Sequence, residues 1–152
     1  MALDTSVIGT EMPSISATME RGRLRAFAKA TGQNEPTYVD LDAATAAGHR
    51  DLPVPPSFLF GIELEAPDPF EWLAELGVDL RFVLHGEQRF DYHRMAYAGE
   101  ELTATSRIED VYSKRGGALD FIVKKTAVTD TDGGPVADLT TVIVVRNPEV
   151  TA

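Results

Sequence analysis

The longest nearly continuous apolar stretch of the chain runs from Val54 to Glu65, near its centre. Pro55 and Pro56 set the backbone angle that suits the start of a helix, and the residues after Ser57 leave almost no polar side over about two helical turns. A helix that is apolar nearly all round must be buried. This one is too short to span a bilayer, which takes roughly 20 apolar residues. We therefore predict a buried central helix over residues 54–65, packed inside a sheet.

Apolar residues at helical spacing predict three further helices, over residues 19–31, 42–48 and 68–77. In the first of these helices, Leu24, Phe27 and Ala28 share one face, and Gly32 suits the position just past the last turn. The third helix begins with an Asp cap followed by Pro at its first position. The helical half of the chain is expected to end at Gly77.

After Gly77 the apolar and polar residues alternate, which is the pattern of β-strands. We predict a short strand near residues 14–18 and four long strands, over residues 82–93, 102–113, 119–130 and 136–146. Simple alternation places His85 and Glu87 together on one face of the first long strand, opposite Leu84 and Phe90. It places Tyr112 on the same face as the apolar residues of the second long strand, which are Leu102, Ala104 and Ile108.

The order of elements, helices first and then four long strands joined by short turns, predicts an α+β fold in which an antiparallel sheet wraps around the central helix. The 152 residues are 43% hydrophobic, enough for one domain spanning residues 1–152. The helix covers only one face of the sheet, and long edge strands tend to pair, so we expect a dimer.

Composition narrows the chemistry. Zero cysteines exclude disulfides and thiolate nucleophiles, and the three histidines have no metal-site spacing, so we expect no metal and no other cofactor. The first residues, Met1 to Thr5, have no basic start and no long apolar run, which predicts no leader, no membrane anchor and a cytoplasmic location.

A net charge of −10 argues against binding nucleic acid. The basic residues are nevertheless clustered at Arg21, Arg23, Arg25 and Lys29, at Lys114-Arg115 and at Lys124-Lys125. Each cluster is either a solvated face or a site for a phosphate-bearing ligand or an acidic carrier protein.

Four segments, in this order and spacing, resemble the MaoC-like dehydratase family of the hot-dog fold: residues 31–36, 55–58, 85–90 and 144–147. The likeness covers almost the whole chain and is greatest to the N-terminal-type branch found in subunits of (3R)-hydroxyacyl dehydratases. Catalytic members add water to, or remove it from, R-3-hydroxyacyl thioesters, and they carry a G-D-x-N-P-x-H signature. There the Asp and His act as general acid and base, and backbone N–H groups at the central helix start polarise the thioester carbonyl.

The signature is incomplete in this chain. Its Gly, Asp, Asn, Pro and His fall on Gly32, Gln33, Glu35, Pro36 and Tyr38. Glutamine exchanges no proton at neutral pH, and tyrosine, with a pKa of about 10, is a poor substitute for imidazole. The resemblance therefore implies a channel-forming subunit that works on acyl-CoA or acyl-carrier-protein thioesters, with catalytic residues unknown in this chain. It implies substrate-binding roles for six residues: Asn34, Pro36, Tyr38, Ser57, Phe58 and Phe60.

Alternatives remain beside this hypothesis. Phe58 and Phe60 are either core residues or walls of an acyl channel, and His85 with Glu87, or Asp40 with His49, are candidate replacements for the missing pair. The chain is then a dehydratase subunit whose partner is a catalytic hot-dog chain, a self-sufficient hydratase or thioesterase, or a noncatalytic acyl-thioester binding protein. Homodimer and heterodimer are both compatible with the sequence.

Overall fold

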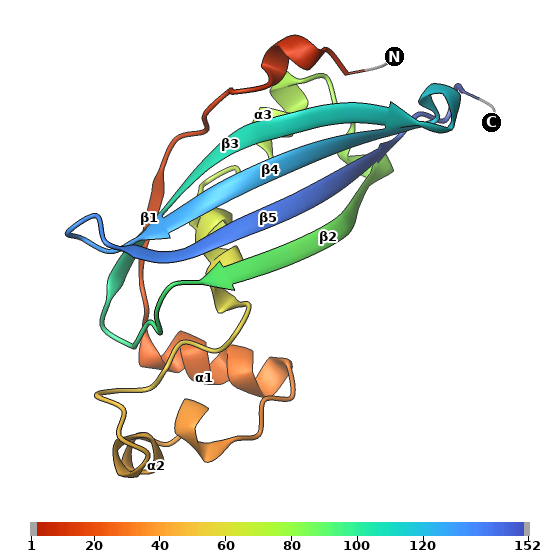
Figure 1. The fold of residues 1–152 in the computed structure, drawn as a ribbon. Coiled ribbons are helices and arrows are strands. Elements are labelled where there is room, and N and C mark those ends of the chain that lie inside the picture. The colour runs from red at the N-terminus through yellow and green to blue at the C-terminus, as the bar shows by residue number, and fades with distance from the viewer. Residues whose placement is uncertain (1–2, 151–152) are drawn as a thin grey trace.

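The structure is a computed structural model that describes residues 3–150. Met1 and Ala2, which belong to the segment predicted to carry no leader, lie outside this range. Five strands form one curled antiparallel sheet: β1 (Ile15–Thr18), β2 (Val83–Tyr92), β3 (Glu101–Lys114), β4 (Leu119–Thr129) and β5 (Pro135–Arg146). Their spatial order is β1-β3-β4-β5-β2, so β1 and β2 form the two edges of this sheet (Figure 1).

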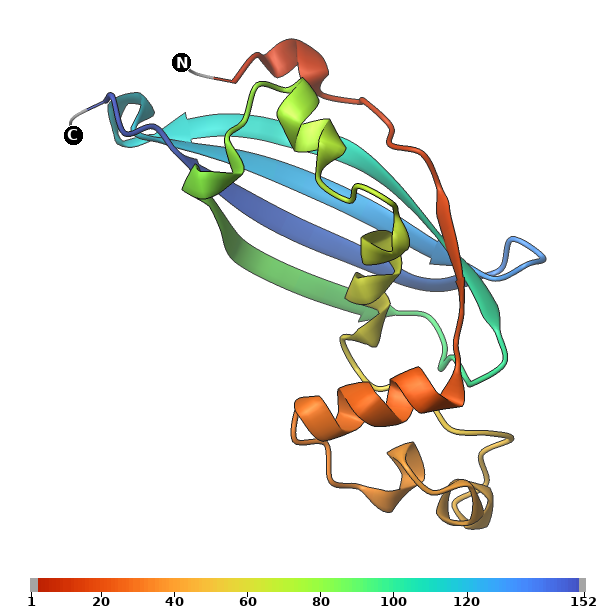
Figure 2. The same ribbon diagram turned by 180° about the vertical axis from the view of Figure 1, so that it is seen from behind.

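The helices are α1 (Arg21–Ala30), α2 (Leu41–Ala46) and α3 (Glu71–Glu75), with 3-10 helices η1 (Thr5–Val7), η2 (Pro36–Tyr38), η3 (Phe58–Glu65), η4 (Leu80–Phe82) and η5 (Arg115–Gly117). The chain from η3 to α3 crosses one face of the sheet, while α1 and α2 lie beyond one end of it (Figure 2). This confirms the predicted α+β hot-dog class. Within residues 3–150, no helix is both long enough and apolar enough to cross a membrane.

The central helix differs from the prediction in type and length. It is the 3-10 helix η3 and begins at Phe58, because Ser57 adopts a left-handed backbone conformation with φ of 70° that interrupts any helix continuing from the two prolines. Its burial is as predicted for Phe58, Leu59 and Ile62, whereas Leu64 is 47% exposed.

Two β-bulges overturn the simple alternation predicted for the strands. In β2, His85 pairs with Ile143 and Glu87 with the adjacent Val142, so the bulge at Gly86 puts His85 and Glu87 on opposite faces. The prediction that they share a face is therefore wrong. In β3, a bulge between Ile108 and Asp110 likewise moves Tyr112 to the outer face, where it stacks on Phe121.

The core fills the concave side of the sheet in two clusters. One surrounds η3 and the buried face of α1 and includes Leu24, Leu59, Ile62, Leu102 and Leu139. The other lies under α3 and includes Leu73, Ile108, Ile122 and Ile143. Between the two clusters the concave face carries polar residues, which become important for the site.

Candidate functional site

A recess at the start of η3 brings together two of the predicted site residues. We call it the tyrosine recess; it measures about 200 Å³ and is lined by Tyr38, Val54, Pro56, Leu59, Tyr92, Arg94, Met95 and Ala96. The backbone N–H of Ser57 donates a hydrogen bond to the Tyr92 Oη, at 2.9 Å. Ser57 and Tyr38 thus meet around Tyr92, a residue for which the sequence offered no signal beyond an aromatic at the end of a strand.

Tyr38 occupies the position of the signature histidine, at the end of η2. Its partial burial, together with the nearby Glu35 and Tyr92, raises the pKa of the Tyr38 hydroxyl above its ordinary value. Its neighbour in the signature, Gln33, uses its side-chain oxygen to accept a bond from the Glu35 N–H at 3.3 Å. At neutral pH, therefore, neither side chain offers a proton acceptor of the kind a dehydratase needs.

The loop beside the tyrosine recess is fixed by a network centred on Arg94. Its guanidinium donates to Glu100 at 2.8 Å and to Asp130 at 3.0 Å. Burial raises the pKa of the Glu100 carboxyl, but hydrogen bonds from Arg94 and the Tyr97 N–H and the charges of Arg94 and Arg50 outweigh it and leave that pKa below its ordinary value. The pKa of the Asp130 carboxyl is also below its ordinary value, and the hydrogen bond from Arg94 is the largest cause.

This network predicts acid-dependent stability. A carboxyl group with a depressed folded-state pKa stabilises the fold above its unfolded pKa, roughly 4, and loses that contribution as pH falls through the folded value. We expect the melting temperature to fall below about pH 4, and to fall less steeply in Arg94→Gln, which starts lower at pH 7. Thermal melts from pH 7 to 3 measure this. The control is Arg81→Gln, because Arg81 pairs with the exposed Asp79 only two residues away. If Arg81→Gln changed the dependence of the melting temperature on pH as much as Arg94→Gln does, the Arg94 network would not be the source of the acid-dependent stability.

A second recess, here called the tryptophan recess, lies between η3, α3 and the concave face of the sheet. It measures about 120 Å³, and its walls are mostly apolar: Phe60, Leu64, Pro69, Phe70, Trp72, Leu73, Val83, Leu84 and Ile143. His85, Thr141, Glu63 and Lys124 complete the lining. The His85 ring lies 5.3 Å from the Phe60 ring, centroid to centroid. Because of the bulge, His85 faces this recess without Glu87.

Glu63 and Lys124 form an ion pair deep on the concave face. The Lys124 Nζ lies 2.8 Å from each carboxylate oxygen of Glu63, and the two side chains are only 9% and 18% exposed. Ser106 and Thr126, both buried, also donate to the Glu63 carboxylate, and the Lys124 ammonium lies 5.7 Å from the centroid of the Trp72 ring. The Glu63 side chain, in the apolar stretch of residues 54–65, therefore points inward, onto the sheet.

The remaining predicted site residues are not brought together. Phe58 is buried and packs edge-on against Phe27, with ring centroids 5.2 Å apart, while Phe60 lines the tryptophan recess. Asn34 and Pro36 are exposed and line neither recess.

Asp40 and His49 do not converge. The Asp40 side chain caps α2 by accepting from the N–H of Asp42, at 2.8 Å. The His49 Nδ1 lies 3.2 Å from the Tyr97 hydroxyl. The Asp40–His49 pair is therefore not a replacement for the missing acid and base.

The basic segment in α1 is largely engaged with other parts of the chain. Arg21 forms a bidentate pair with Asp51, Arg23 pairs with Glu65, and Arg25 donates to the Val39 carbonyl at 2.8 Å. The Lys124-Lys125 pair splits, with Lys124 inside and Lys125 on the outer face. These residues therefore do not form a cluster of free cations for a phosphate.

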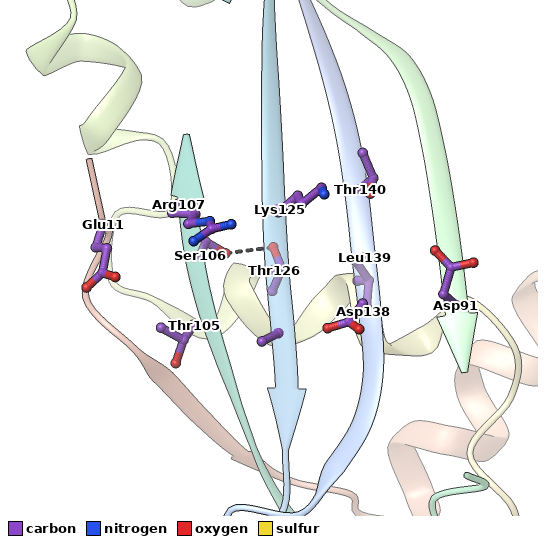
Figure 3. A pocket seen from close by; sticks show the side chains of 11 residues that line it. Glu11, Asp91, Thr105, Ser106, Arg107, Lys125, Thr126, Asp138, Leu139 and Thr140 are labelled. Atoms are coloured by element: carbon purple, nitrogen blue, oxygen red, sulfur yellow. Dashed lines mark hydrogen bonds between the residues drawn. The ribbon is translucent and has the colours of Figure 1, made fainter. Parts of the chain in front are cut away.

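The outer face of the sheet carries a separate polar hollow of about 480 Å³ (Figure 3). Arg107 and Lys125 lie at its centre, with Glu11 on one side and Asp91 and Asp138 on the other. Both cations pair with Glu109, at 2.9 and 3.5 Å. Mixed and internally paired charges give this hollow no preference for an anionic or an apolar ligand. Within residues 3–150, no group of three or more His, Asp or Glu side chains is arranged to hold a metal ion.

Exposed apolar side chains follow the free edge of β2. Leu84 and Tyr92 belong to the strand itself and are 52% and 48% exposed. Leu64 and Phe70 flank it at the tryptophan recess, and Met95 flanks it at the tyrosine recess. Both recesses thus open beside the same edge strand.

The curled sheet, the central helix and the two recesses define a hot-dog chain, and comparison with known proteins gives its family. The family described as "FAS1-like, dehydratase domain region" matches residues 6–139. The UPF0336 protein of Streptomyces griseus is 40% identical over 150 residues, covering 98% of this chain and 99% of the relative. That of Saccharopolyspora erythraea is 34% identical, with 96% and 93% covered. The chain therefore belongs to the FAS1-like dehydratase region family and to the UPF0336 proteins.

Solved structures agree with this assignment. The C-terminally truncated HadBC (3R-hydroxyacyl-ACP dehydratase) complex from Mycobacterium tuberculosis contains a chain 26% identical to this one, with a TM-score of 0.76 over 93% of this chain and 99% of that chain. A MaoC-like dehydratase is 23% identical, with a TM-score of 0.81 over 95% of this chain and 43% of that chain. The ChsH1–ChsH2 complex, also from Mycobacterium tuberculosis, is 22% identical, with a TM-score of 0.74 over 93% and 86%. The predicted resemblance to MaoC-like hot-dog dehydratases is confirmed.

Proposed function

We propose that this chain is the channel-forming subunit of an R-specific 3-hydroxyacyl-thioester dehydratase or enoyl hydratase. A partner hot-dog chain supplies the catalytic Asp and His. The observation that carries the proposal is the free edge of β2, beside which lie two half-open recesses and a row of exposed apolar side chains. A strand from a second chain would pair with this edge, cover the apolar row and close both recesses.

The division of labour follows from what the signature positions can do. Dehydration takes a proton from C2 of the substrate and returns one to the departing C3 hydroxyl, so it needs an acceptor and a donor near neutral pH. Gln33 exchanges no proton, and Tyr38, whose pKa is raised, stays protonated and offers no acceptor. What this chain does offer is apolar walls for an acyl chain and a backbone N–H at Ser57, which the Tyr92 hydroxyl occupies in the free chain. Rotation of Tyr92 would release that donor for a thioester carbonyl.

The similarity to the HadBC complex, named as a 3R-hydroxyacyl-ACP dehydratase, supports a two-chain enzyme. Arg21 and Arg23 of α1 are paired within the chain, so they do not indicate whether the thioester is carried by CoA or by acyl-carrier protein. Experiment decides between these two carriers. We place the protein in fatty-acyl metabolism on this basis.

The test compares the isolated chain with a mixture. The partner is a hot-dog protein of the same genome that carries the intact G-D-x-N-P-x-H signature. Hydration of crotonyl-CoA should be absent with either chain alone and should appear when they are combined and elute together in gel filtration. Turnover by the isolated chain would instead identify a self-sufficient enzyme, and His85→Ala would then show whether the histidine in the tryptophan recess takes part.

A third outcome separates the last alternative. If the two chains bind each other but the mixture has no activity on CoA or carrier-protein thioesters, the chain is a noncatalytic acyl-thioester binding protein. Assembly is tested with Leu84→Ala, at a residue of β2 that is 52% exposed. Its matched control is Leu80→Ala, since Leu80 is 48% exposed but belongs to η4, before the strand begins.

A further inference from the structure

The tryptophan recess has a neighbour on the other side of η3. A third recess of about 340 Å³ opens toward β1; Met12, Pro13, Ile15, Ala66 and Pro67 give it apolar walls, and the acidic residues Asp68, Glu71 and Glu75 also line it. Three residues line both recesses: Glu63, Pro69 and Trp72. These three residues, here called the wall, therefore lie between the tryptophan recess and the third recess.

The wall is held together by charge as well as by packing. Glu63 receives both hydrogen bonds of Lys124 at 2.8 Å and those of Ser106 and Thr126, while the ammonium lies over the Trp72 ring. A buried ion pair contributes little net stability compared with apolar residues of the same size, but separating its members is costly because neither regains water. The ion pair therefore holds both side chains in place, and an apolar chain entering from the β2 side would meet space that they already fill.

The volume of the tryptophan recess limits the length of the acyl chain that it can hold. A cavity of about 150 Å³ in another protein holds benzene, a ring of six carbons. The tryptophan recess, at about 120 Å³, is slightly smaller. A linear acyl tail would therefore place at most about six carbons in it before reaching the wall.

We propose that Glu63, Lys124 and Trp72 form a partition that limits the acyl chain to about six carbons within this subunit. The proposal rests on the proposed function and deepens it by naming the substrate class as thioesters with short acyl tails. The partition acts by filling space, so side chains of similar volume preserve the limit whether or not they carry charge.

Two double variants separate volume from charge. Glu63→Ala with Lys124→Ala opens the partition, whereas Glu63→Leu with Lys124→Met removes the charges but keeps the volume. In the assembled two-chain enzyme, we expect the first variant to raise the kcat/KM ratio of 12-carbon to 6-carbon enoyl-CoA by at least about tenfold, since each newly buried methylene is worth about fourfold. The second variant should leave the ratio unchanged. Trp72→Leu is a further opening variant, with a smaller gain expected, that leaves the ion pair in place.

A partner-independent measurement uses the protein's single tryptophan, which is Trp72 itself. Titrating the isolated chain with acyl-pantetheines of 4 to 12 carbons and following its fluorescence should give a Kd that falls with each methylene up to about six carbons and then stays level. In the double alanine variant the fall should continue. A wild-type Kd that keeps falling to 12 carbons would overturn the partition, as would equal gains in kcat/KM ratio for the two double variants.

The two proposals fail separately. If the assembled pair is inactive on every thioester while the fluorescence titration shows the plateau, the proposed function is wrong and the partition stands. If the pair is active and the double alanine variant, folded by circular dichroism, has the wild-type chain-length profile, the partition is wrong and the proposed function stands.

Discussion

Lys124→Met should destabilise the protein by about 3 kcal/mol, more than any double replacement that keeps the volume of the Glu63–Lys124 pair. The single change leaves the Glu63 carboxylate 18% exposed and without its cation, with only the hydroxyls of Ser106 and Thr126 for partners. Replacing both members by Leu and Met removes the desolvation cost together with the attraction, so that variant should lie within about 1 kcal/mol of wild type. Urea unfolding followed by circular dichroism measures both values.

The adjacent residue supplies the control. Lys125→Met makes the same chemical change one position along β4, but Lys125 points to the outer face, is 51% exposed and lies 3.5 Å from Glu109. Its loss should be below about 0.5 kcal/mol. Equal losses for the two methionine variants would show that the inner pair is no more important to stability than an exposed one.

These two lysines also show what the sequence could and could not predict. The strand that contains them was predicted, because alternation and turn residues are local signals. That one lysine lies inside follows from the same alternation. Its partner, however, is 61 residues away on η3, and no local pattern in an otherwise apolar helix indicates that Glu63 turns toward the sheet. Long-range pairing is decided by tertiary packing, so the Glu63–Lys124 pair cannot be predicted from a local pattern.

The bulges mark a second limit. A single extra residue in one strand reverses every later side chain relative to the earlier ones, so the predicted alternation breaks at Gly86 in β2 and after Ile108 in β3. In β2 the glycine is a usable signal, because glycine inside a strand often marks a bulge. The structure shows why glycine stands there, since an added Cβ at Gly86 would lie 2.8 Å from the Val144 side chain. In β3 no such residue is present. The candidate pair of His85 and Glu87 failed for this reason alone.

The predicted site shows a third limit. The degenerate signature could be read directly from Gln33 and Tyr38, and the structure adds the raised pKa of Tyr38. The recesses could not be read in this way, since each one is lined by residues from at least three segments distant in the chain. The resemblance located the start of the central helix, but the Tyr92 hydroxyl that occupies the Ser57 N–H came from β2.

Ile62→Ala should lower the melting temperature by about 6–15 °C, while Leu64→Ala, two residues later on η3, should change it by less than about 2 °C. Ile62 is 1% exposed among the residues around η3, so truncation leaves a cavity costing about 2–5 kcal/mol. Leu64 is 47% exposed and lines the tryptophan recess beside β2. Differential scanning calorimetry of the two variants gives the comparison.

The variants Ile62→Ala and Leu64→Ala also distinguish an effect on folding from an effect on assembly with the partner chain. Under the proposed function, Leu64 is covered only when the partner chain closes the β2 edge, so Leu64→Ala should raise the Kd for the partner by about tenfold although the isolated chain is as stable as wild type. Ile62→Ala should have little effect on that Kd at temperatures where it is folded. Unchanged partner affinity in Leu64→Ala would mean that the partner does not cover this part of η3. The exposed apolar row beside β2 would then need another explanation.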